Sequence, residues 1–330
     1  TKDTSNLNSI RLTFLHAFQW LLVNLVICLV LPLVIAPHLG LDDEGLRQLT
    51  QRTFFYSGIA TLIQALWGHR MPIFESPSTL WVGAAVALSA NAHIIGKPLS
   101  LLRGEIALGF IIGGILYLIV AALRLMNHLT KLFTPAVMGT FFVLVVIQIA
   151  KSLSSSFITF TNGSVQLYWL NIAVAILTIS TVQLITIYGR GSLRCFSLLS
   201  GVVAGWLAYI ALTSITGNEY GGPDFSNLAA LEPPVWLAWG SLSIDPLVLG
   251  TSLVIAFMAF ANLIATVKGM ALELNNDKVN MDHAVMMTGI ANILGGVGGT
   301  IGYVSGSHSI GFVSITRNSS RNPIILQSFF

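Results

Sequence analysis

The chain has 330 residues, of which 54% are hydrophobic and 9% are charged, and its formal net charge is +3. A soluble globular domain typically carries about 25% charged residues, so this composition excludes that class. Two cysteines and no basic cluster give no basis for a disulfide framework, a metal site or nucleic-acid binding. The composition instead predicts an all-α polytopic membrane protein.

Apolar runs of bilayer-crossing length recur along the chain. A transmembrane helix needs about 20 apolar residues, and "WLLVNLVICLVLPLVI" (20–35) and "ALGFIIGGILYLIVAAL" (107–123) are clear examples. Between the later spans, the Gly-, Pro- and Trp-rich segment 217–246 predicts a loop at the membrane surface. The whole pattern predicts ten spans, near residues 12–36, 53–68, 77–94, 105–125, 135–153, 168–188, 196–215, 247–272, 284–300 and 309–325.

The positive charges indicate which side of the membrane each connection faces. With the N-terminus inside, eleven of the 16 Lys and Arg residues fall on the cytoplasmic side and five fall outside. This distribution follows the positive-inside tendency of membrane proteins. The sequence therefore predicts a multi-pass protein of the cell membrane (plasma or inner membrane) with a cytoplasmic N-terminus.

Two of the spans are interrupted. After Pro77, the third span has only about 16 residues before polar sequence returns, which is too few for a helix that crosses the bilayer. The tenth span begins "GYVSGSHSIGFVSITR" (302–317), which is extended, then polar, then helical in pattern. Both patterns predict a short strand followed by a half-helix. Such backbone is tolerated at membrane depth only inside protein or beside a cavity, and paired interruptions point to a transporter's central site.

Several segments resemble, in order, the nucleobase/ascorbate transporter family, which includes the uracil and xanthine permeases. "HSIGFVSITR" (308–317) is similar to the family signature, with Gly311, Thr316 and Arg317 matching. His308 and Ser309 stand where the family has an acid or amide and an Asn.

Three further segments carry the resemblance. "GHRMPIFESPSTLWVG" (68–83) resembles the stretch before the family's third span, and "LFTPAVMGTFFVLVVIQI" (132–149) resembles the start of its fifth span. "FQWLL" (18–22) is similar to a first-span Gln-His, with Trp20 replacing the His. With these substitutions in the family motifs, the chain is similar to an outlying branch of the family, the purine permeases.

The resemblance implies a seven-plus-seven inverted-repeat fold with a core domain and a gate domain, of which about ten of the fourteen spans are present. It divides the chain into a first core segment (1–130), a gate segment (131–216), an extracellular loop (217–246) and a second core segment (247–330). It implies a secondary active transporter for purine or related nucleobases that works by alternating access and is coupled to H⁺ or Na⁺. No cofactor or nucleic-acid partner is expected, and a homodimer is left open.

The candidate substrate-binding residues begin with the starts of the two half-helices. His308 and Ser309 belong to one, and Ser78 and Thr79 belong to the other. Exposed N–H groups at a helix N-terminus suit the electronegative edge of a base. The alternative for the serines is simple helix capping.

Glu75 is the one carboxylate that the predicted spans leave at membrane depth, so it is a candidate for proton or cation coupling, together with His308. The alternative is an interfacial Glu paired with His69 or Arg70. In the eighth span the family resemblance places a base-binding Glu at Met258, and Asn262 lies one turn further along. Met258, Asn262 and Gln19, the last on the first span, complete the candidate substrate site.

Three other functions compete with nucleobase transport. An anion or aromatic-acid carrier of the same fold would favour a helix dipole without a nearby carboxylate, and Glu75 argues against it. A channel would not need paired broken helices. An enzyme would need a nucleophile with a positioned base, or metal-ligand spacing, and the sequence offers neither.

Overall fold

The computed structural model describes residues 2–134, 136, 137, 139, 140, 143, 144, 147, 157–161, 164–190, 196–216, 235–276 and 279–330. The chain divides into two compact units. Unit 1 comprises residues 1–134, 231–310 and 319–330, and unit 2 comprises residues 135–230 and 311–318.

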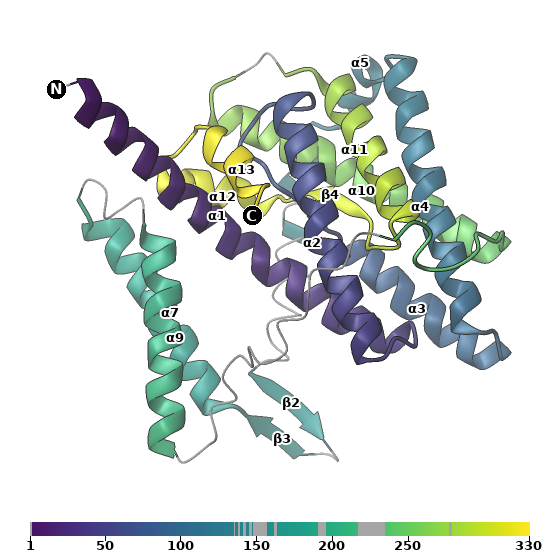
Figure 1. Ribbon diagram of the computed structural model, residues 1–330, viewed down its shortest axis with the longest axis horizontal. Helices are drawn as coiled ribbons and strands as arrows, with labels where there is room; N and C mark the ends of the chain where they lie inside the picture. Colours follow the sequence, from purple (N-terminus) through teal and green to yellow (C-terminus); the bar gives the residue numbers. More distant parts are fainter. Residues whose placement is uncertain are drawn as a thin grey trace. The chain divides into compact units, whose positions relative to one another are not determined.

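Unit 1 is a bundle of helices built from both ends of the chain (Figure 1). Its N-terminal half contains α1 (Lys2–His38), α2 (Asp43–Leu66), β1 (Glu75–Pro77), α3 (Thr79–Ile95), α4 (Leu99–Ala122), α5 (Met126–Leu129) and the 3-10 helix η1 (Thr130–Leu132). Its C-terminal half contains α10 (Pro246–Glu273), α11 (Met281–Val297), β4 (Tyr303–Ser305), the start of α12 (His308–Thr316) and α13 (Asn322–Gln327).

Five of the described helices are long and apolar enough to cross a membrane: residues 11–38 of α1, 99–122, 169–188, 197–215 and 246–273. The prediction of a multi-pass membrane protein is thereby confirmed. Helix α3 is apolar but shorter, in agreement with an interrupted third span. The predicted fifth span, 135–153, lies mostly outside the described residues, as does most of the predicted loop 217–246.

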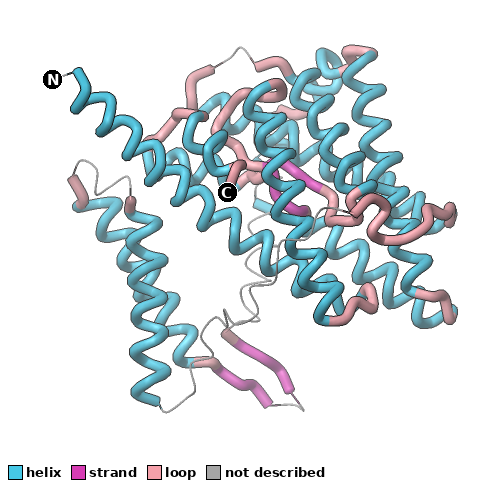
Figure 2. Tube along the Cα trace, viewed as in Figure 1, coloured by secondary structure: helices cyan, strands magenta, loops and turns pink. Residues whose placement is uncertain are grey.

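The interrupted spans meet in a two-stranded antiparallel sheet, drawn in magenta among the helices in Figure 2. Glu75 lies opposite Ser305, Ser76 opposite Val304, and Pro77 opposite Tyr303. The prediction of short strands in the third and tenth spans is confirmed.

The predicted tenth span, 309–325, is wrong in its second half. Helix α12 ends at Thr316, and Arg317 adopts a left-handed backbone with φ of 56°. The polar run "RNSSRN" (317–322) favours a turn over a buried helix, and Pro323 suits the first turn of the separate helix α13.

Close backbone approach holds the core of unit 1. A Cβ added to Gly289 on α11 would lie 2.7 Å from the carbonyl oxygen of Gly114 on α4. Small residues at such a crossing allow helix backbones to pack tightly inside a membrane. Trp81 of α3 meets Phe110 of α4 edge to face, with ring centroids 4.5 Å apart. These contacts make a rigid support for the strand pair.

Unit 2 contains α7 (Trp169–Tyr188), α9 (Ser197–Thr216) and a hairpin of β2 (Ile158–Thr161) with β3 (Ser164–Leu167). Helices α7 and α9 pack on each other (Figure 1). A Cβ on Gly205 would lie 2.2 Å from Thr178 Oγ1, so this position requires glycine.

A three-residue ion cluster ties the α3–α4 loop to α10. Lys97 Nζ donates to Glu105 Oε2 at 2.6 Å and to Asp245 Oδ2 at 2.8 Å. Asp245 is also the N-cap of α10, where its Oδ1 accepts from the backbone N–H groups of Leu247 and Val248. The bond from Lys97, followed by that from Val248, lowers the pKa of the Asp245 carboxyl.

We expect Asp245→Asn to lower the melting temperature at pH 7. The pair with Lys97 is lost, at a cost of about 0.5–1 kcal/mol for a partly exposed pair, while Asn still caps the helix. Because the carboxyl pKa is lowered in the fold, its contribution is complete above the unfolded value and is lost as pH falls through the folded value. The difference between wild type and variant, measured by thermal unfolding in detergent, should therefore shrink below about pH 4. Asp245→Ala is the matched comparison, and it should lose about 1 kcal/mol more with the cap.

Candidate functional site

The strand pair places two helix N-termini at opposite ends of one short sheet. Strand β1 leads into α3 and β4 leads into α12. The backbone ladder continues beyond the strands, because Ser78 N–H donates to Gly302 O and Gly306 N–H donates to Phe74 O, both at 2.9 Å. Helix α3 therefore begins beside the start of β4, and helix α12 begins beside the start of β1.

Side chains from α2 satisfy the outer backbone groups of β1, and α1 supports one of them. Thr61 Oγ1 accepts from the Glu75 N–H at 2.9 Å, and Ser57 Oγ donates to the Glu75 carbonyl oxygen at 2.6 Å. Asn24 Nδ2 in turn donates to Ser57 Oγ at 3.2 Å. These bonds replace the partners that a wider sheet would supply.

Two asparagine amides do the same for β4. Asn292 on α11 accepts from the Tyr303 N–H and donates to the Tyr303 carbonyl oxygen, each at 3.1 Å. Asn262 on α10 donates to the Ser305 carbonyl oxygen at 2.9 Å. Asn262 was a candidate from the sequence, whereas Asn292 was missed. A lone Asn in an apolar helix was the available signal for it.

Glu75 lies inside this arrangement and is fully buried. Its Oε1 accepts from Ser305 Oγ at 2.5 Å and lies 3.8 Å from His69 Nε2. Its Oε2 is buried with no hydrogen-bond partner among the described residues. The alternative interpretation paired Glu75 with His69, and the structure places the two side chains together. The depth of Glu75 in the membrane stays a prediction.

His69 is fixed by the turn that follows α2. Its ring nitrogen Nδ1 accepts from the backbone N–H of Met71 at 3.0 Å. The backbone N–H of His69 donates to Gln64 Oε1 at 3.3 Å. The Gln64 amide is bonded to α11 through the Ala284 carbonyl oxygen and Thr288 Oγ1. The imidazole ring therefore has one defined orientation, with Nε2 directed toward Glu75.

Three polar atoms at the two helix starts are buried without a hydrogen-bond partner in the described structure: Ser78 Oγ, Ser309 Oγ and His308 Nε2. Ser78 is the N-cap residue of α3 but its hydroxyl makes no capping bond, so the capping alternative does not account for it. The His308 ring lies on Phe74, with centroids 4.6 Å apart, and Trp20 meets Phe74 edge-on at 5.8 Å.

The remaining candidates lie around this cluster. Gln19, next to Trp20 on α1, is buried. Thr79 is exposed at the first position of α3, and the Met258 side chain on α10 is 42% exposed. A substrate contact by any of these three stays a prediction. Among the described residues, no three His, Cys, Asp or Glu side chains lie together in a way that could hold a metal ion.

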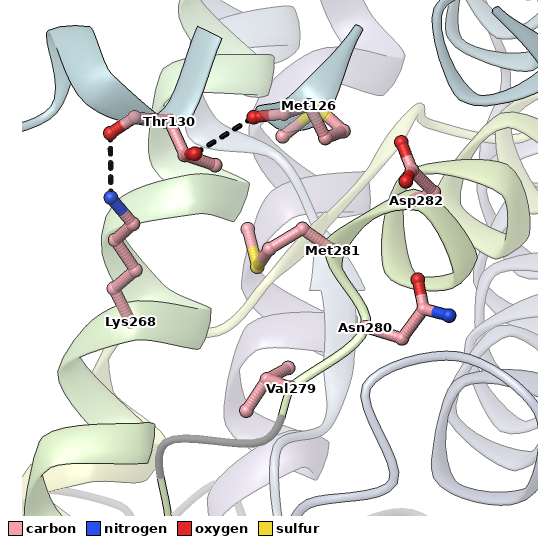
Figure 3. A pocket seen from close by; sticks show the side chains of 7 residues that line it. All are labelled: Met126, Thr130, Lys268, Val279, Asn280, Met281 and Asp282. Atoms are coloured by element: carbon pink, nitrogen blue, oxygen red, sulfur yellow. Dashed lines mark hydrogen bonds between the residues drawn. The ribbon is translucent and has the colours of Figure 1, made fainter. Parts of the chain in front are cut away.

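A separate pocket of about 520 Å³ is lined by residues of unit 1 that include Lys268 and Thr130 (Figure 3). Lys268 Nζ donates there to the Thr130 carbonyl oxygen at 2.6 Å, and Thr130 Oγ1 donates to the Met126 carbonyl oxygen at 2.7 Å. No candidate residue lines it. Its lining residues are Met126, Thr130, Lys268, Val279, Asn280, Met281 and Asp282.

We expect Asn292→Ala to destabilise the strand pair. The N–H and C=O of Tyr303 lose their amide partner, and an unsatisfied buried group costs about 1–3 kcal/mol. Thermal unfolding in detergent measures the loss. Thr251→Ala is the control, since its hydroxyl makes only an exposed bond within α10 and its removal should leave the melting temperature nearly unchanged. Equal melting temperatures for the two variants would contradict the role of Asn292.

Sequence comparison finds permeases. A family model described as "Permease family" matches residues 11–330. YwdJ of Bacillus subtilis (strain 168), whose name assigns it provisionally to the purine permeases, is 25% identical over 324 residues, which cover 95% of this chain and 71% of that protein. The uric acid transporter UacT of Escherichia coli (strain K12) is 26% identical over 320 residues, or 92% of this chain and 61% of its own length.

The chain is similar to uric acid permease PucK of Bacillus subtilis (strain 168) at 22% identity, over 97% of this chain and 72% of that protein. It thus spans between 61% and 72% of the length of these three relatives. Among solved structures, the transmembrane domain of the cyanobacterial bicarbonate transporter BicA matches with a TM-score of 0.52 and 15% identity, over 95% of this chain and 80% of that domain. That likeness shows a shared transporter fold.

Proposed function

The chain belongs to the nucleobase/ascorbate transporter family of permeases, and from that premise we propose that it carries purine or related nucleobases across the cell membrane by alternating access. The relatives are transporters rather than enzymes. The observation that carries the proposal is the strand pair with two half-helix starts, where buried polar atoms have no partner among the described residues.

This arrangement suits a planar ligand whose edge alternates hydrogen-bond donors and acceptors. The Ser78 and Ser309 hydroxyls can each donate or accept, and His308 Nε2 does either according to its tautomer. Phe74 offers an aromatic surface beside them. The base would therefore satisfy groups that the protein leaves open, at the positive ends of α3 and α12.

We assign unit 1 the role of the substrate-binding core and unit 2 that of the gate. The site residues Glu75, Ser78, Asn262, His308 and Ser309 all belong to unit 1. Alternating access then consists of motion of the core against the gate. The positive-inside distribution supports a cytoplasmic N-terminus in the plasma or inner membrane.

Coupling to a cation completes the proposal. A carboxyl within a membrane-spanning region is a proton or ion site by default, and Glu75 is fully buried in the protein on β1, the strand of the interrupted third span. We take H⁺ as the first candidate and Na⁺ as the second, with Glu75 and His308 as the groups that could take part.

A ligand panel tests the proposal directly. We expect xanthine, uric acid or hypoxanthine to raise the melting temperature of the purified full-length protein, since a ligand at 100 times its Kd adds about 2.7 kcal/mol to stability. Sulfate, bicarbonate and benzoate form the comparison arm. Stabilisation by these anions and by no base would replace nucleobase transport with an anion or aromatic-acid carrier.

The two serines give a residue-level test. We expect Ser78→Ala and Ser309→Ala each to weaken base binding about fivefold, the equivalent of one hydrogen bond near 1 kcal/mol. The melting temperature without ligand should stay the same, because neither hydroxyl has a partner to lose in the described structure.

Ser89→Ala is the matched control. The Ser89 hydroxyl donates to the His38 carbonyl oxygen at 2.6 Å, outside the site, so its loss should lower the melting temperature without changing affinity. Serine variants that melt earlier yet bind the base normally would mean that Ser78 and Ser309 are structural.

A further inference from the structure

We infer that Glu75 alone carries the exchanged proton, and that His69 is a neutral positioning residue that directs a fixed N–H group at it. This rests on the proposed function, whose coupling group it identifies. The two residues have the spacing of an ion pair, with His69 Nε2 3.8 Å from Glu75 Oε1.

The hydrogen bonds of His69 determine its charge. A ring nitrogen that accepts a hydrogen bond cannot carry a proton, and Nδ1 accepts from the Met71 N–H at 3.0 Å. The ring proton of the neutral form is therefore on Nε2, toward Glu75. A second proton would break the bond to Met71 and leave a buried backbone N–H unsatisfied, which disfavours the charged ring.

Glu75 has no cation with which to balance its charge in the described part of the chain. The contacts of its carboxyl are the Ser305 hydroxyl and the neutral His69 ring, and no described Lys or Arg makes an ion pair with it. A buried carboxylate without a countercharge is strongly unfavourable. Binding a proton removes the charge, while the hydrogen bond from Ser305 Oγ holds Oε1 in place and His69 Nε2 faces the same oxygen at 3.8 Å.

The other titratable groups on the packed elements make contacts with residues other than Glu75. Cys28 on α1 donates to Asn24 Oδ1, and Tyr303 on β4 donates to the Thr53 carbonyl oxygen. Tyr56 on α2 packs in the cluster with Tyr303, Ala60 and Ala291. The His308 ring, at the start of α12, lies on Phe74. Glu75 is thus the one of these groups that stands on the strand pair with an open carboxyl oxygen, and we assign the proton to it rather than to His308.

The open Oε2 links the proton to the base. In the acid form, the new O–H bond can donate to a ring nitrogen or a carbonyl oxygen of the base, and the proton comes from the aqueous side. In the carboxylate form, the same oxygen repels those acceptors. Base and proton therefore bind together and leave together, which is the requirement for symport.

The test is base affinity as a function of pH in the full-length protein, with xanthine and hypoxanthine as probes. In wild type we expect base affinity to fall by about tenfold for each unit that the pH rises, in the range where protonation of Glu75 limits binding. Glu75→Gln, which mimics the acid form, should bind without this dependence. His69→Gln keeps an N–H group near Nε2, and His69→Asn keeps an acceptor near Nδ1, so both should retain the wild-type slope.

Two results would overturn the inference: a Glu75→Gln variant that keeps the slope, or a His69→Gln variant that loses it. His308→Gln is the control, with weaker binding but an unchanged slope.

If Glu75→Gln fails to fold, infrared titration of wild type and Glu75→Asp replaces it. A buried carboxylic-acid band that appears at low pH and shifts in the aspartate variant supports the inference, and an imidazolium signal lost in His69→Gln refutes it. This readout needs no ligand, so failure of nucleobase binding, which would refute the proposed function, is distinguishable from failure of the proton assignment.

Discussion

The structure depends on one constraint, which is that backbone N–H and C=O groups at membrane depth must find partners inside the protein. The third and tenth spans break the helical pattern, and β1 and β4 satisfy each other only along the edge that they share. Their outer edges are completed by Thr61, Ser57, Asn262 and Asn292. The interrupted backbone thus requires polar residues on the surrounding helices, and these fix where two half-helices begin.

Polar side chains near the strands consequently divide into two groups. The first group bonds to the backbone of the two strands and so holds the strands in place. Ser78, Ser309 and His308 contribute nothing to this bonding and leave buried polar atoms open in the described structure. Open groups of this kind lower stability, so their retention at both helix starts is best understood as preorganisation for a ligand. This division separates the residues that complete the strand backbone from those proposed to bind more clearly than burial does, since Asn262 and Ser309 are both buried.

The sequence was sufficient to predict the membrane class, the two interrupted spans and the helix starts at Ser78 and Ser309, because hydropathy length and proline placement are local signals. It was insufficient for the register of β1 on β4, because pairing between residues 230 positions apart leaves no local trace. Asn292 was missed although its partner Tyr303 is only 11 positions away, because a lone Asn in an apolar helix does not reveal which backbone group it bonds. The end of α12 was misplaced because apolar residues resume after the polar run, in α13. The described residues also leave the predicted roles of Met258, Thr79 and Gln19 untested.

The position of the carboxyl group has a mechanistic consequence. Where the family resemblance expects a Glu on the eighth span, this chain has Met258, while its buried carboxyl stands on the strand itself. A residue whose N–H is bonded to Thr61 and whose carbonyl oxygen is bonded to Ser57 has a fixed backbone that cannot swing toward or away from a ligand. The buried carboxyl of this chain therefore stands on a backbone fixed from both sides, with its Oε1 held by Ser305 Oγ and facing His69 Nε2.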